Sequence, residues 1–161
     1  MNKGMRRSDR LIQEKRHDVY QEKEKLPEPT LCSECGVLFT NGRWTWGDPP
    51  KGANQTLCPA CRRVAENLPA GYIEIRGQFF KEHQDEILNL ARNIEQQERN
   101  ERPLERIMAI TPESDHTLVT TTGVNIARRI GEAISRSYNG DFSFQYADGE
   151  KSIRVYWQRA Q

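Results

Sequence analysis

The chain has 161 residues, of which 35% are hydrophobic and 29% are charged, and its formal net charge is +1. These values allow one domain or two small ones, and they exclude both a single large hydrophobic core and a globally basic charge. No stretch is long and apolar enough to predict a membrane span, and the N-terminus lacks the apolar segment of a secretory signal.

Residues 1–30 form a charge-dense segment with few apolar side chains. Its first 16 residues hold six lysines and arginines against two acidic residues. Such a segment cannot bury enough surface to fold alone, so we predict a flexible basic arm. Arg6, Arg7 and Arg10 are candidate contacts to RNA phosphates, and the alternative is a solvated tail.

Residues 31–77 contain all four cysteines, as Cys32-x-x-Cys35 and Cys58-x-x-Cys61 with 22 residues between the pairs. Two such pairs can direct four thiolates toward one tetrahedral cation, so we predict a closed structural zinc site. Iron in a rubredoxin-type centre is an alternative. Disulfides suit secreted chains, and a redox CxxC would leave the second pair unexplained. Zinc in a reducing, cytoplasmic setting is therefore the expectation.

The rest of this module is expected to be a hairpin followed by a short helix. Residues 43–46 alternate with the period of a strand, which places both tryptophans on one face, and residues 62–68 predict the helix. This layout is typical of a zinc ribbon or treble clef. The tryptophans suit the core of a small module or, alternatively, a surface for stacking bases, and the arginines could offset the charge of the metal site. The candidate RNA contacts here are Arg43, Trp44, Trp46, Arg62 and Arg63.

Residues 78–103 predict one long connecting helix. Phe80, Ile87, Ala91 and Ile94 recur at helical spacing and form a single apolar stripe. The end of the segment is fully polar until Pro103, so we expect a solvated connector between two folded parts.

Residues 104–161 predict a small domain with the order β-β-α-β-β. The expected elements are strands at 107–110 and 117–121, a helix at 124–138, and strands at 142–146 and 153–157. A helix on one face of an antiparallel sheet leaves the other face open, with Gln145, Arg154, Tyr156 and Gln158 outward. That face is either an RNA surface or an ordinary solvated one. The candidate RNA contacts of this domain are Arg128, Arg129, Arg136, Arg154 and Tyr156.

No catalytic motif is found in the sequence. There is no Gly-rich phosphate loop and no Ser-His-Asp or Cys-His pattern, and the three histidines lie in different segments. We therefore expect a non-enzymatic α+β protein without a small-molecule substrate.

Two segments after the cysteine pairs carry a family resemblance. They are E-R-I-M-A-I at 105–110 and T-T-T-G-x-x-I-A-R-R-I-G at 120–131. With the zinc module, they make residues 31–159 similar to the Nmd-type large-ribosomal-subunit export adaptor family, including short bacterial relatives of its N-terminal half. The resemblance implies a non-enzymatic factor that docks on the large ribosomal subunit.

The expectation from the sequence is thus a cytoplasmic zinc protein that binds structured RNA, with the ribosome and its rRNA as partners. Arginines would contact phosphates, and aromatic rings would contact exposed bases. The alternative is a zinc-dependent adaptor that holds a protein partner, and electron transfer through iron is a third possibility.

Overall fold

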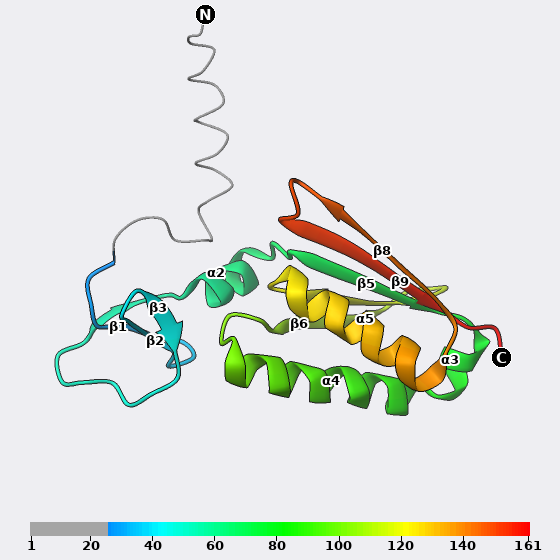
Figure 1. The fold of residues 1–161 in the computed structure, drawn as a ribbon, viewed down its shortest axis with the longest axis horizontal. Coiled ribbons are helices and arrows are strands. Elements are labelled where there is room, and N and C mark those ends of the chain that lie inside the picture. The colour runs from blue at the N-terminus through cyan, green and yellow to red at the C-terminus, as the bar shows by residue number, and fades with distance from the viewer. Residues whose placement is uncertain (1–25) are drawn as a thin grey trace, which may run out of the picture.

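The computed structural model describes residues 26–161, and the prediction of a flexible basic arm falls mainly on residues outside this range. The described part is α+β, with two mixed sheets and four helices, as expected for the class (Figure 1). The smaller sheet belongs to residues 30–66, here named the cysteine module. The larger one belongs to residues 71–158, here named the sheet domain.

The cysteine module is a four-stranded sheet followed by a helix. Its elements are β1 (Thr30–Cys32), β2 (Leu38–Thr40), β3 (Arg43–Thr45), β4 (Asn54–Thr56) and α2 (Pro59–Glu66). The strand order is β3-β2-β1-β4, and only β1 and β4 are parallel. Asn41 and Gly42 both have positive φ, 54° and 78°, which suits the tight turn between β2 and β3.

The sheet domain is a five-stranded sheet with three helices. Its elements are β5 (Gly71–Arg76), α3 (Gln78–Glu82), α4 (Gln84–Glu101), β6 (Ile107–Pro112), β7 (Thr117–Thr121), α5 (Val124–Tyr138), β8 (Asp141–Ala147) and β9 (Ser152–Gln158). The strand order is β6-β7-β5-β9-β8, with β5 antiparallel to β7 and parallel to β9.

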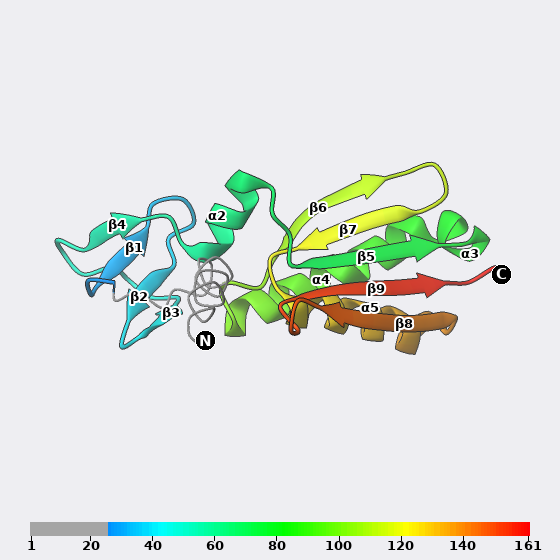
Figure 2. The same ribbon diagram turned by 90° about the horizontal axis from the view of Figure 1, so that it is seen from above.

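Helices α4 and α5 cover one face of this sheet, and among the described residues no helix lies over the face turned to the viewer in Figure 2. Alternation explains the core, because every second residue of the central strands points toward the helices. Ile73 and Val155 are fully buried there, together with Ile130 and Ile134 of α5. Within this part of the chain, no helix has the combination of length and apolarity that crossing a membrane requires.

The sheet domain differs from the predicted β-β-α-β-β order, because it begins with β5. The alternating segment Gly71–Arg76 was assigned to the zinc module, but its pairing with β7 and β9 makes it the central strand of the other sheet. Its partners lie far away in the sequence, so local pattern alone did not reveal them.

The predicted connecting helix also differs from the observed structure. It is broken at His83, whose backbone (φ −122°, ψ 29°) separates α3 from α4. Its apolar stripe is not solvated: Phe80, Ile87 and Ala91 are buried in the core of the sheet domain. Residues 78–101 therefore form part of that domain's second layer.

Candidate metal centre and RNA-binding surfaces

The four cysteines lie together at one end of the cysteine module. Cys32 ends β1 and Cys35 lies in the following turn, whereas Cys58 caps the N-terminus of α2 and Cys61 lies in its first turn. Their Sγ atoms all lie within 4.8 Å of one another, and none forms a disulfide. The predicted clustering of the four thiols is confirmed.

The geometry of the cluster fits one tetrahedral metal ion. Four sulfurs at the Zn–S bond length of about 2.3 Å lie about 3.8 Å apart. The distance from Cys35 Sγ to Cys58 Sγ is 3.9 Å. Backbone N–H groups also point at sulfur, since Glu34 and Cys58 donate to Cys32 Sγ at 3.4 and 3.3 Å. Such donors stabilise thiolates, which is the form that binds metal.

Burial and backbone hydrogen bonds act in opposite directions on these thiols. Burial raises the pKa of Cys58, and it also raises that of Cys61. Burial acts in the same direction on Cys32, but the backbone N–H donors around it outweigh burial and hold its pKa at about 6. Metal binding must therefore displace protons from Cys58 and Cys61, so the affinity for metal rises with pH.

A side chain that the sequence analysis did not select completes the surroundings of the cysteines. Arg106, 6% exposed, comes from the sheet domain. It donates from Nη1 to Cys61 Sγ at 3.2 Å and from Nη2 to Cys35 Sγ at 3.0 Å, with a longer contact from Nη2 to Cys58 Sγ at 3.7 Å. A guanidinium suits a cluster of thiolates. Arg106 lies 45 residues after Cys61 in the sequence, however, so no local pattern indicated that the two are in contact.

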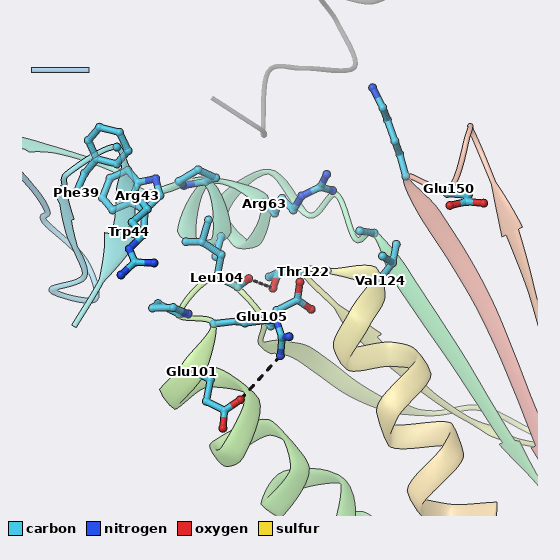
Figure 3. Close-up of a pocket in the computed structure, with 18 residues that line it drawn as sticks. Phe39, Arg43, Trp44, Arg63, Glu101, Leu104, Glu105, Thr122, Val124 and Glu150 are labelled. Carbon is cyan, nitrogen blue, oxygen red and sulfur yellow. Dashed lines mark hydrogen bonds and ion pairs between the residues drawn. The ribbon is translucent and has the colours of Figure 1, made fainter. Parts of the chain in front are cut away.

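Three of the predicted RNA contacts meet at a groove between the cysteine module and the sheet domain. Arg43 and Trp44 line one side, and Arg63 of α2 lies nearby, in a groove of about 610 Å³ (Figure 3). The opposite side is formed by the sheet domain, with Glu105 and Thr122. Both acidic and basic side chains line this groove, so it has no uniform charge.

Both tryptophans pack against the cysteine cluster, as predicted for a core role. Trp44 also contacts Phe39, with ring centroids 5.1 Å apart. Trp46 donates from Nε1 to the backbone carbonyl of Arg99 at 2.7 Å, which links the module to α4. Neither ring is fully exposed, and Arg62 lies half-buried on α2.

The other predicted residues lie on two further surfaces of the sheet domain. Arg154 and Tyr156 are on β9 and point to the face that carries no helix, because the intervening Val155 is buried beneath α5. They meet Tyr72 of β5 there: the Arg154 guanidinium lies over the Tyr72 ring, 4.3 Å from its centroid. Tyr72 was not among the predicted residues, although the alternation of residues 71–76 would have identified it.

Arg128, Arg129 and Arg136 are exposed on α5, which lies on the opposite side of the sheet. Arg129 binds the buried carboxylate of Glu98 on α4, with Nε at 2.6 Å from Oε2. Arg128 binds Glu132 at 3.0 Å and donates to the Tyr146 hydroxyl at 3.1 Å. Both therefore have intramolecular partners. Arg6, Arg7 and Arg10 lie outside the described residues.

Comparison of the chain with protein-family models gives no match, and comparison with curated proteins gives no significant match.

Proposed function

We propose that this chain is a non-enzymatic, cytoplasmic zinc protein that binds structured RNA on the large ribosomal subunit. The observation that carries the RNA part is the cluster of Tyr72, Arg154 and Tyr156 on the uncovered sheet face. The resemblance of residues 31–159 to the export adaptor family supports the ribosome as the source of the RNA.

The register of the sheet places these three side chains beside one another. Tyr72 pairs with Arg154, and Glu74 pairs with Tyr156, so the two tyrosines are diagonal neighbours on adjacent central strands. Small α+β modules bind unpaired bases on such a face, where aromatic rings stack against the bases. The Arg154 guanidinium, which lies over the Tyr72 ring, can stack on a base or contact a phosphate with its N–H groups.

Glu74, the acidic residue beside Tyr156 on this face, already has a cationic partner. Glu74 forms an ion pair with Arg76, which also binds Asp115 at 2.9 Å. The charge of Arg154 is therefore not cancelled by the carboxylate nearest in the sheet. Unpaired bases in rRNA loops fit this combination of two rings and one guanidinium.

Substitutions of Tyr156 test this surface. Tyr156→Ala is expected to weaken binding to purified large ribosomal subunits about 5- to 150-fold, since stacking on one ring contributes about 1–3 kcal/mol per base. Tyr156→Phe keeps the ring and should bind within about twofold of the wild type. Affinity is measured by co-sedimentation over a range of subunit concentrations, after thermal unfolding has shown equal stability. Equal affinity of all three proteins would remove this face from the proposal.

The zinc part has its own test. Elemental analysis of the purified, reduced protein is expected to give one zinc ion per chain, and the protein should be colourless. A red protein that contains iron in place of zinc would instead support the electron-transfer alternative. Binding to a partner that resists both high salt and ribonuclease would favour the protein-adaptor alternative.

A further inference from the structure

Arg106 belongs to the sheet domain by its backbone and to the metal centre by its side chain. Its backbone N–H donates to Thr122 Oγ1 at 2.8 Å, and its carbonyl accepts the N–H of Thr122 at 2.9 Å. The Nε atom donates to the carbonyl of Pro103 at 2.9 Å, which fixes the direction of the side chain. The guanidinium is thereby held rigidly against the sulfurs of Cys35 and Cys61.

The burial of this guanidinium requires a negative charge at the cysteine cluster. None of the carboxylate ion pairs found within residues 26–161 involves Arg106. A buried cation without an anionic partner is strongly unfavourable. Four thiolates around a divalent ion carry a net charge of about −2. Arg106 contacts the sulfurs of Cys35, Cys58 and Cys61, and metal binding makes thiolates of all three, so the metal-loaded cluster supplies the largest counter-charge.

Other contacts join the two parts beside Arg106. Leu104 packs against the cysteine cluster, and the Trp46 indole donates to the carbonyl of Arg99. The Arg99 guanidinium also lies over the Trp46 ring, 5.7 Å from its centroid, but Arg106 is the charged side chain that touches the atoms that would hold the metal. Loss of the metal would reduce the negative charge on the sulfurs that Arg106 contacts and so weaken the contact between the two parts.

We propose that Arg106 couples occupation of the metal centre to docking of the cysteine module on the sheet domain, so that the metal sets the relative orientation of the two parts. The inference rests on the zinc part of the proposed function and is independent of RNA binding. Coupling is reciprocal, because a contact that forms with the loaded centre must also raise the affinity for metal by the same factor.

Zinc affinity of the full-length chain tests the first half of this coupling. Arg106→Gln removes the charge, Arg106→Lys keeps it without the planar fork, and Arg92→Gln is the control because Arg92 lies exposed on α4. Competition with a coloured zinc chelator is expected to show about 10- to 100-fold weaker zinc binding for Arg106→Gln, as for other residues that contact metal ligands. Arg106→Lys should lie between this value and the wild type, and Arg92→Gln should match the wild type.

Residual dipolar couplings test the second half, in the same zinc-loaded proteins. Couplings from the cysteine module and the sheet domain should fit one alignment tensor in the wild type and in Arg92→Gln. In Arg106→Gln each part should keep its own internal fit, but the two should no longer share a tensor. If Arg106→Gln does not fold, the same comparison is made with Arg106→Lys.

Cobalt substitution gives a signature that a purely structural arginine would not change. Hydrogen bonds from Arg106 lower the energy of the sulfur electrons, so the sulfur-to-cobalt charge-transfer bands should move to longer wavelength in both Arg106 variants. The inference would be overturned if the Arg106 variants bound zinc as tightly as the wild type, kept its cobalt spectrum and shared one alignment tensor between the two parts. The zinc proposal would remain intact. A wild-type chain that binds no metal would overturn both.

Discussion

Glu105 acts as the cap of a helix to which it does not belong. Helix α5 begins after Gly123, which has no side chain to cap it, and the Glu105 carboxylate accepts the N–H of Ile126 at 2.9 Å instead. A side chain at position 123 would collide with this carboxylate, since an added Cβ would lie 2.3 Å from its oxygens. Burial raises the pKa of Glu105 above its ordinary value.

This raised pKa predicts a pH-dependent effect of Glu105→Gln. The folded protein holds the Glu105 proton more tightly than the unfolded chain, so the contribution of this group to stability falls as pH rises from about 4.5 through the raised pKa. Glutamine does not titrate. The stability of Glu105→Gln relative to the wild type should therefore increase with pH over this window, as measured by urea unfolding of the zinc-loaded proteins. A difference that is constant with pH would contradict this account.

Among single residues, the clustering of the cysteines could be predicted, whereas the roles of Arg106 and Glu105 could not. Two CxxC pairs bring their own thiols together through local turns, so spacing alone was sufficient. Arg106 and Glu105 act on groups that lie 45 and 21 residues away. Only the pairing of distant segments brings these charges to their partners, and no periodic pattern records it.

At the scale of elements, α4 and α5 are joined by an ion pair with one buried member. Glu98 on α4 is 2% exposed, and it binds both Arg129 of α5 and Arg102, at 2.6 and 3.2 Å. A buried carboxylate needs these partners, because its desolvation is otherwise uncompensated. Arg129 thus contributes to the packing of α4 against α5, whether or not α5 also contacts a ligand.

Removing Arg129 should therefore change stability more than removing a neighbouring arginine. Arg129→Ala is expected to lower the free energy of unfolding by about 1–3 kcal/mol, since of the two arginines that bind Glu98 within residues 26–161 Arg102 alone would remain. Arg136→Ala, an exposed position on the same helix, should change it by less than about 0.5 kcal/mol. Urea unfolding of both variants provides the measurement. If Arg129→Ala and Arg136→Ala were equally stable, the ion pair of Glu98 and Arg129 would contribute nothing to the free energy of unfolding.

The elements were predictable where their pattern was local. Strands β6 to β9 and helix α5 appeared close to their expected ranges, because alternation and helical spacing are visible within a few residues. The role of β5 was missed, since its partner β9 lies at the far end of the chain. The mistaken solvated connector follows from the same omission: without β5, the apolar stripe of α4 had no sheet to cover.

At the scale of the molecule, eight of the predicted RNA contacts divide among three surfaces. Arg43, Trp44 and Arg63 lie at the groove, Arg154 and Tyr156 on the uncovered sheet face, and the α5 arginines on the opposite layer. Sequence analysis placed Arg154 and Tyr156 on the open face of the sheet, but it could not bring Tyr72 to that face before the position of β5 was known. Contact with all three surfaces would require a large, folded RNA, which rRNA provides.

Sedimentation of the full-length protein with ribosomes tests the central claim most directly. Lysate that contains the tagged protein is separated on sucrose gradients at low and high salt, with and without ribonuclease. We expect the protein to migrate with the large subunit or the whole ribosome at low salt, and to leave it at high salt because phosphate contacts release counterions. Protein that remains at the top of the gradient at low salt would contradict the proposed ribosomal function.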